Sequence, residues 1–194
     1  MALTASTMML ELGIPAPEFR LPDVVSGKTI SLETFKSKQG LLVMFICRHC
    51  PYVVHVKEEL AQLGRDYANK SLGIVAISAN DAKHYPDDAP DKLGQMAKQL
   101  GFTFPFCYDE TQEAAKAYTA ACTPDFFLFG NDRKLVYRGQ LDESRPGSGK
   151  PVTGRDLRAA IDAVLAGKPV STKQMPSMGC NIKWKPGREP DYFK

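Results

Sequence analysis

The chain has 194 residues, a formal net charge of +3, 43% hydrophobic residues and 24% charged residues. These values are ordinary for one globular domain, and the small charge without a basic cluster argues against a nucleic-acid-binding protein. No apolar run reaches the roughly 18 residues of a membrane span. The N-terminus also lacks the basic start and long apolar core of a signal peptide. We therefore expect a cytoplasmic protein with neither a membrane nor a nucleic acid as its partner.

The first half of the chain predicts a hairpin and then strands that alternate with helices. Extended pieces at 19–21 and 28–32 flank Gly27, which indicates the hairpin. The continuous apolar run 41–46 predicts a strand buried on both faces, and 73–78 predicts the next one. Between these strands, apolar residues three and four apart predict one buried face of a helix, namely Val53, Val56, Leu60, Leu63 and Tyr67.

The second half continues this alternation and then adds an antiparallel pair. A polar loop at 80–90 leads to a helix that ends at Gly101, and 104–108 is a short extended piece. A short helix at 113–120 precedes a strand at 126–129 and its return strand at 134–137. After a polar loop, Thr153 is expected to cap the last helix, which ends at Gly167.

Strands alternating with helices, followed by a late antiparallel pair, predict a three-layer α/β sandwich. Its mixed central sheet is flanked by helices, with an N-terminal hairpin and an irregular C-terminal tail. The domain is expected to span residues 1–170. Residues 171–194 show no periodicity and are interpreted as a tail packed on the domain.

Cys47 and Cys50 stand between the strand at 41–46 and the helix that follows, separated by two residues. Two thiols at this spacing can close a small disulfide and open it again. The unpaired N–H groups and the dipole of a helix N-terminus stabilise a thiolate, which is the reactive form. Arg48 and His49 lie between the two cysteines, and a cation near Cys47 would lower its pKa and make the disulfide more oxidising.

A zinc site is the other common use of two cysteines at this spacing, but a structural site needs two more ligands, usually a second close pair. The remaining cysteines are Cys107, Cys122 and Cys180, and the histidines are His49, His55 and His84. None of these forms a second close pair. Redox use of the two thiols is therefore favoured, with no bound metal or cofactor, and metal binding stays open as an alternative.

Four segments resemble the thioredoxin-like superfamily, and within it the redoxin branch of the alkyl hydroperoxide reductase and thiol-specific antioxidant type. They are the entry segment 16–22, the active-site segment 47–51, Phe104-Pro105 with Asp109, and Thr123-Pro124 before the strand at 126–129. The resemblance covers roughly residues 13 to 168. It implies a cis bond before Pro124 and a Thr123 backbone that receives an extended substrate.

The resemblance also implies an activity, that of an antioxidant thiol–disulfide oxidoreductase that needs no bound cofactor. Cys47, the more exposed thiol, would attack a protein or small-molecule disulfide with a pKa below that of a free thiol. Cys50 would then resolve the mixed disulfide, and an unidentified thiol electron donor would recycle the pair.

The chain departs from its relatives at several positions. Thioredoxins have a Trp where this chain has Ile46 and a buried Asp where it has Leu41, which leaves Glu58, Glu59 and Asp125 as candidate proton acceptors. Peroxiredoxins place their reactive cysteine at the position of Cys50, with a Thr at that of Cys47 and an Arg at that of Pro124. A peroxidase therefore lacks two of its activating groups here and remains an alternative.

Four single residues complete the set of candidates. His55 lies on the helix after the cysteines and is interpreted as incidental to the site. Cys107 and Cys122 adjoin apolar strands and are expected to be small buried side chains, with Cys122 close to the dithiol. Cys180, in the tail, either packs on the domain or folds back to pair with Cys47.

Overall fold

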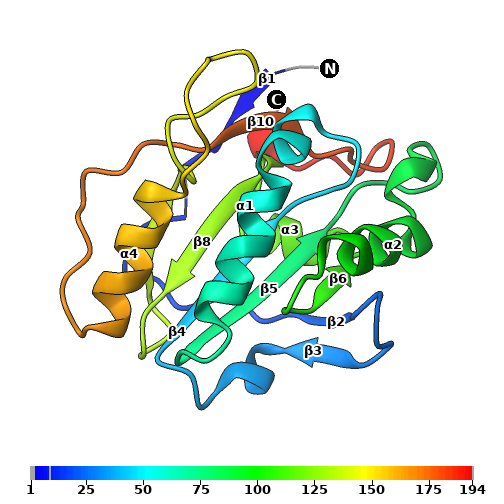
Figure 1. Ribbon diagram of the computed structural model, residues 1–194. Coiled ribbons are helices and arrows are strands. Elements are labelled where there is room, and N and C mark those ends of the chain that lie inside the picture. Colours follow the sequence, from blue (N-terminus) through cyan, green and yellow to red (C-terminus); the bar gives the residue numbers. More distant parts are fainter. Residues whose placement is uncertain (1–2, 9, 194) are drawn as a thin grey trace.

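A five-stranded mixed sheet forms the centre of the computed structural model, which describes residues 3–8 and 10–193 (Figure 1). The strand order is β6-β5-β4-β8-β9. The first three of these strands run parallel, and β8 pairs antiparallel with both β4 and β9. The strands are β4 (Gly40–Phe45), β5 (Leu72–Ser78), β6 (Phe106–Tyr108), β8 (Asp125–Phe129) and β9 (Leu135–Gly139). The predicted mixed sheet is confirmed.

The central strand β4 is buried over its whole length, as its apolar sequence predicts. Successive side chains of a strand point to opposite faces. Leu42 and Met44 accordingly join one hydrophobic cluster, while Val43 and Phe45 join the other. The sheet therefore has a core on each face, which is the three-layer arrangement.

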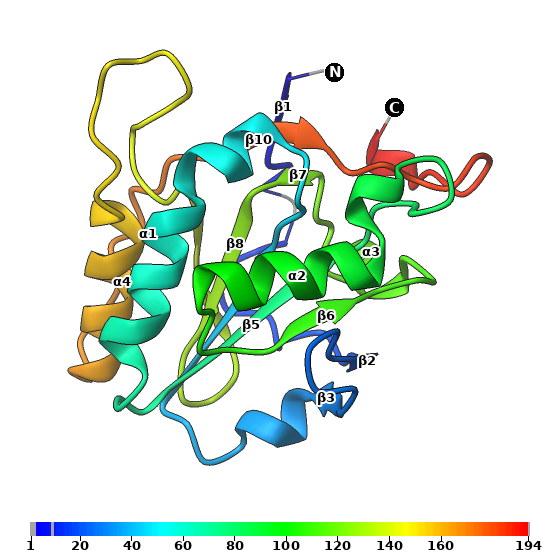
Figure 2. The ribbon, with the colours of Figure 1, turned by 45° about the vertical axis from the view of Figure 1, so that its right-hand side comes forward.

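Three helices cover one face of the sheet and shorter elements cover the other (Figure 2). The first face carries α1 (Pro51–Tyr67), α2 (Pro90–Leu100) and α4 (Arg155–Leu165). The second carries α3 (Glu113–Ala117), the antiparallel hairpin of β2 (Arg20–Pro22) and β3 (Thr29–Ser31), and part of the C-terminal segment. Short 3-10 turns lie at Leu32–Phe35, Pro86–Asp88 and Asp191–Phe193.

The helix boundaries follow the sequence signals except at α4 and at α3, which ends at Ala117 rather than Ala120. The five predicted apolar residues of α1 are all buried, and Gly101 ends α2 in the left-handed conformation at φ 64°. The expected N-cap of α4 is wrong, since that position belongs to Gly154 at φ 65°. The carboxylate of Asp142 instead accepts the backbone N–H groups of Thr153 and Gly154, which satisfies donors just before the helix.

A second, three-stranded sheet joins segments from both ends of the chain to its middle. Its order is β1-β10-β7, formed by β1 (Leu3–Ala5), β10 (Met178–Asn181) and β7 (Cys122–Thr123), and both pairings are antiparallel. The expectation of an irregular tail is therefore wrong for residues 178–181. Within the described ranges, no helix has the length and apolar character needed to cross a membrane.

Candidate redox site

The two cysteines lie between the end of β4 and the start of α1. Cys50 is the N-cap residue of α1 and Pro51 is its first residue, where the missing N–H of proline costs no helical hydrogen bond. Both side chains are buried, with 1% of Cys47 and none of Cys50 exposed. Cys47 was expected to be the more exposed of the two, but both thiols are almost fully covered.

Thr123 lies against both sulfurs. Its hydroxyl oxygen is 3.3 Å from the Cys47 Sγ, and its carbonyl oxygen is 3.1 Å from the Cys50 Sγ. The bond between Thr123 and Pro124 is cis, as predicted. The structure thus brings the two cysteines together with the predicted pair Thr123 and Pro124, although they are more than 70 residues apart in sequence.

Hydrogen bonding places the thiolate of the reduced pair on Cys50. A hydrogen bond from the Cys47 thiol lowers the pKa of Cys50 to about 4, and further hydrogen bonds from Cys180, Thr123 and the Val53 amide act in the same direction against burial. The Thr123 carbonyl favours the protonated thiol, but these donors outweigh it. The pKa of Cys47 is correspondingly raised by its hydrogen bond to Cys50, by burial and by the negative charge of Asp88. The predicted low pKa of Cys47 is therefore wrong, because the stabilised thiolate is on its neighbour.

A pH titration of the ultraviolet absorbance of the thiolate checks this assignment. We expect one thiolate in the reduced protein with a pKa of about 4. Cys50→Ser should remove this absorbance in the acidic range. Cys47→Ser should raise the midpoint towards that of a free thiol, because the main hydrogen-bond donor is lost. An acidic midpoint that survives in Cys50→Ser would place the thiolate on Cys47 instead.

The two residues between the cysteines both have carboxylate partners. The Arg48 guanidinium donates to Asp87 at 2.9 Å, and both side chains are well exposed, so the pair contributes little. The His49 ring hydrogen-bonds Asp88 through Nδ1 at 2.5 Å and stacks on Tyr85. The hydrogen bond to Asp88 raises the pKa of His49. The side chains of Arg48 and His49 are therefore both paired with carboxylates next to the dithiol.

Asp88 is a site residue that the sequence reasoning missed. It is fully buried and accepts the backbone N–H groups of Arg48 at 2.8 Å and His49 at 3.2 Å, as well as the Asn80 side-chain amide at 2.7 Å. Burial opposes its ionisation, but the hydrogen bonds from His49 and Asn80 keep its pKa below the usual range. Asp88 thus holds the loop between the cysteines. One sequence signal could have found it. The loop after β5 begins next to the loop after the parallel strand β4, which carries the cysteines, so a polar residue there can reach the site.

The three carboxylates proposed as proton acceptors are all in the wrong place. Glu58 and Glu59 are seven and eight residues after the start of α1, or roughly 10–12 Å along a helix. Glu59 also pairs with Arg158 at 2.8 Å. Asp125 is opposite Phe45 in the sheet, on the face away from α1. These residues were proposed as acceptors for Cys50, whereas the carboxylate of Asp88 acts on the pKa of Cys47.

The remaining candidates fall into two groups. His55 hydrogen-bonds the Ser144 hydroxyl and His84 hydrogen-bonds Asp81, so both lie outside the dithiol contacts. Cys107 and Cys122 are buried, as predicted, and burial raises the pKa of Cys107 to about 12. Cys180 does fold back onto the site, where its thiol lies beside Cys50.

Cys47, His49 and Asp88 form a group that is able to hold a metal ion. One ligand atom from each lies within 4.8 Å of the others. A thiolate and an imidazole suit copper(I) or zinc. A metal would have to displace the hydrogen bonds that Asp88 already makes to the loop.

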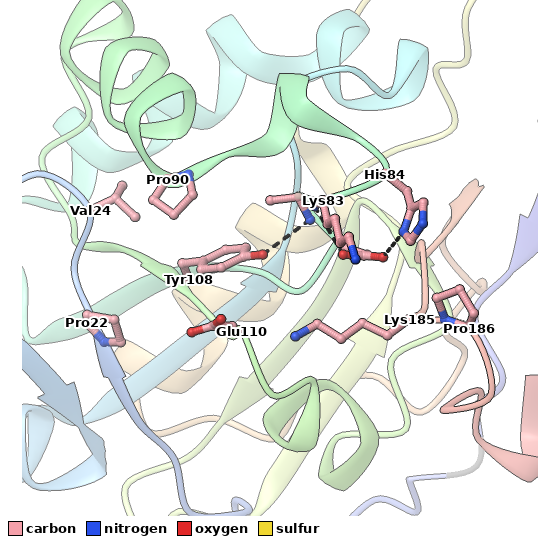
Figure 3. A pocket seen from close by; sticks show the side chains of 11 residues that line it. Pro22, Val24, Lys83, His84, Pro90, Tyr108, Glu110, Lys185 and Pro186 are labelled. Atoms are coloured by element: carbon pink, nitrogen blue, oxygen red, sulfur yellow. Dashed lines mark hydrogen bonds and ion pairs between the residues drawn. The ribbon is translucent and has the colours of Figure 1, made fainter.

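A cavity of about 820 Å³ lies beside this region, next to the loop that carries Asp88. Figure 3 shows Lys83, His84 and Lys185 with Tyr108 on its wall. The Tyr108 hydroxyl accepts the Ala82 N–H and donates to the Asn80 carbonyl. Asn80 therefore hydrogen-bonds both Tyr108 on the cavity wall and Asp88 at the dithiol. The lining of the cavity includes neither Cys47 nor Cys50.

The chain is similar to one protein family and to several solved structures. The redoxin family model matches residues 11–157. The structure of an uncharacterized conserved protein from Geobacillus kaustophilus is 54% identical over 96% of this chain and 98% of that chain, with a TM-score of 0.93. A hypothetical protein from Sinorhizobium meliloti 1021 is 51% identical over 95% of this chain and 100% of that chain, with a TM-score of 0.92.

A more distant match shares the fold alone. The thioredoxin domain of a thiol-disulfide oxidoreductase from Bacteroides vulgatus is 19% identical over 70% of this chain and 90% of that chain, with a TM-score of 0.56. The search of curated proteins found no match. The fold is thioredoxin-like, and the family model covers well over half of the sequence. The chain therefore belongs to the redoxin family.

Proposed function

We propose that the protein is a thiol–disulfide oxidoreductase that uses Cys47 and Cys50 as its redox-active pair. The observation that carries this proposal is the pair of buried sulfurs at the start of α1 that both contact Thr123. Hydrogen bonding lowers the pKa of Cys50, one of this pair. A thiolate beside a protonated thiol is the state from which a disulfide is both attacked and resolved. The family and the thioredoxin-like fold support an oxidoreductase of this general kind.

The two cysteines carry the electrons of the reaction, so no bound cofactor takes part in it. The Cys50 thiolate attacks one sulfur of a substrate disulfide, which forms a mixed disulfide and releases one substrate thiolate. The sequence reasoning gave this first attack to Cys47, but the hydrogen bonding favours Cys50. Cys47 then loses its proton and attacks the Cys50 sulfur, which closes the Cys47–Cys50 disulfide and releases the second substrate thiol. A thiol electron donor would return the pair to the reduced form.

The residues around the pair support specific roles in this reaction. Thr123 contacts both sulfurs, and its backbone edge is paired with β10, so an extended substrate would bind along this edge only in place of β10. His49, beside Cys50, contributes positive charge that stabilises the thiolate, since a thiolate on Cys50 raises the pKa of His49. The proposal includes a cytoplasmic setting, where thiols are reduced at rest and a pair of this spacing is more often catalytic than structural.

The reduction potential of the Cys47–Cys50 pair, equilibrated against glutathione, is the test. We expect a reversible two-electron couple between about −270 and −120 mV. Because the reduced form is stabilised by the low pKa of Cys50, the value should lie above that of thioredoxin. Cys50→Ser should abolish the couple. If the wild-type protein forms no Cys47–Cys50 disulfide, the oxidoreductase proposal fails. Rapid consumption of hydrogen peroxide would then favour the peroxidase.

Metal binding is a second candidate because Cys47, His49 and Asp88 converge. This proposal assigns the site to copper(I) or zinc, held by a thiolate and an imidazole with the carboxylate. Stoichiometric metal in the purified protein, lost in both Cys47→Ser and His49→Ala, would support it. Retention of the metal in His49→Ala would exclude this set of ligands.

A further inference from the structure

A third sulfur lies beside the dithiol. Thr123 contacts the sulfurs of both Cys47 and Cys50, and Cys180 is its partner on the neighbouring strand, which places the Cys180 thiol near enough to Cys50 for each to shift the pKa of the other. Cys180 is 4% exposed and lies directly opposite Thr123 in the pairing of β10 with β7. Cys50 is therefore flanked by two thiols, one from its own loop and one from the C-terminal segment.

The strand β10 occupies the backbone edge that an extended substrate would use. It runs antiparallel to Cys122 and Thr123. The residues directly before and after β10 form further hydrogen bonds to the same segment. The Ser177 hydroxyl donates to the Pro124 carbonyl, and the Ile182 N–H donates to the Ala121 carbonyl. The segment thus has the position and direction of a bound peptide that presents a cysteine to Cys50.

Gly179 allows this close approach. A Cβ built on Gly179 would lie 1.9 Å from the Thr123 carbonyl oxygen and 2.6 Å from its carbonyl carbon. Real atoms do not approach so closely, and the obstacle is backbone that cannot turn aside. The residue before Cys180 must therefore be glycine for β10 to lie on this edge.

We propose that Cys180 is a third redox-active thiol, which resolves mixed disulfides on Cys50 by forming a Cys50–Cys180 disulfide. This inference rests on the proposed function of the dithiol and extends it to the C-terminal segment. The two thiols are neighbours, and a disulfide between them requires the sulfurs to approach to about 2.0 Å. The strand pairing and the fit of Gly179 hold Cys180 in that position.

The chemistry balances without any further reactant. When Cys50 carries a mixed disulfide, the Cys180 thiol gives up its proton and attacks the Cys50 sulfur. The S–S bond to the substrate breaks, and the substrate leaves as a thiolate that takes the proton. Cys47 can then attack Cys50 in the same way, which forms Cys47–Cys50 and returns Cys180 to the thiol. Cys50 thus forms a disulfide first with Cys180 and then with Cys47.

The variant Cys47→Ser isolates the second partner. After equilibration with glutathione disulfide, we expect it to contain a Cys50–Cys180 disulfide, identified by mass spectrometry of the peptides. Cys47→Ser combined with Cys180→Ser should instead retain glutathione on Cys50, at least tenfold more than the single variant. The matched control combines Cys47→Ser with Cys122→Ser, which removes another buried nearby thiol and should leave the Cys50–Cys180 disulfide intact. Persistent glutathione on Cys50 in the single variant would overturn the proposal.

Gly179→Ala supplies a second, independent measurement. In combination with Cys47→Ser, it should prevent the Cys50–Cys180 disulfide, because the added methyl group displaces β10 from Thr123. In the otherwise wild-type chain, it should leave the Cys47–Cys50 disulfide able to form, which also shows that the protein is folded. If wild-type protein forms Cys47–Cys50 but Cys47→Ser never forms Cys50–Cys180, the inference about Cys180 is wrong while the proposed function stands.

Discussion

Replacement of Asp88 by alanine is expected to lower the free energy of unfolding by about 3–5 kcal/mol, the usual cost of removing one partner from a buried charged pair. The midpoint of thermal unfolding should fall by roughly 10 °C for a chain of this size. The physical reason is that the change leaves the backbone N–H groups of Arg48 and His49, and the Asn80 amide, without their acceptor inside the protein. No other carboxylate takes these three bonds.

The deficit caused by Asp88→Ala should depend on pH in a defined direction. The pKa of His49 is raised from 6.5, so its contribution to stability is full below that value and is lost as the pH rises through the folded pKa. The pKa of Asp88 is lowered from 3.8, so its contribution is present above that value and is lost as the pH falls. The difference from wild type should therefore be largest between about pH 4 and 6.5.

Asp87 is a matched control because it is the adjacent carboxylate in the same turn. Its side chain is exposed and pairs with that of Arg48, which is also open to solvent, so Asp87→Ala should cost less than about 1 kcal/mol. Denaturant unfolding at several pH values measures both variants. Equal losses for the two variants would show that the loop does not depend on the buried carboxylate. Asp88→Ala should also lower the pKa of Cys47, whose thiolate the charge of Asp88 disfavours.

The sheet and its helices could be predicted because their signals are local and repetitive. The buried strand β4 is a continuous apolar run, and the core-facing residues of α1 recur with the helical period. The cis Thr123–Pro124 bond followed from a motif rather than from periodicity. These features depend on residues that are near each other in sequence, so one chain is enough to recognise them.

Asp88 and β10 could not be predicted in this way. Asp88 is in a polar loop and contacts the backbone of Arg48 and His49, which precede it by 40 and 39 positions. The strand β10 has four residues and lacks the alternation of a half-buried strand. Its place is fixed by the absence of a side chain at Gly179, which acts only against the distant Thr123.

The pKa of Cys47 was predicted wrongly for a related reason. Arg48 and His49 adjoin it in sequence, which suggested two cations at its thiol. In the folded chain the Arg48 guanidinium pairs with Asp87 and the His49 ring with Asp88, and the negative charge of Asp88 raises the pKa of Cys47. Adjacent residues in a loop need not face the same group, so sequence neighbours are a poor guide to the charge around a thiol.

Arg138→Met is expected to lower the free energy of unfolding by about 3–5 kcal/mol at neutral pH, again the cost of leaving a buried charge without its partner. Arg138 is 1% exposed, and its guanidinium lies 3.9 Å from the carboxylate of the fully buried Asp125. It also donates to the Ser6 hydroxyl at 3.1 Å and to the Thr119 carbonyl at 2.8 Å. Methionine fills much of the same space but provides neither the charge nor the donors.

The pH dependence separates the lost charge from the lost hydrogen bonds. Burial raises the pKa of Asp125 to about 6 even though Arg138 opposes this. A carboxyl whose folded pKa is raised does not destabilise the protein below its ordinary pKa of 3.8. The destabilisation grows as the pH rises from that value and is complete above the folded pKa. Without Arg138 the pKa of Asp125 should rise further. The deficit of Arg138→Met should therefore be smallest near pH 4 and largest at neutral pH.

The double variant Arg138→Met with Asp125→Asn completes this test. Asparagine keeps a side-chain acceptor for the Ser6 hydroxyl and the Ala121 N–H but removes the charge. We expect it to recover part of the stability at neutral pH and to flatten the loss with rising pH. A double variant as unstable as Arg138→Met at neutral pH would mean that the charge of Asp125 is not the cause. Because Asp125 begins β8 directly after Thr123 and Pro124, the ion pair with Arg138 stabilises the turn that holds Thr123 against the two cysteines.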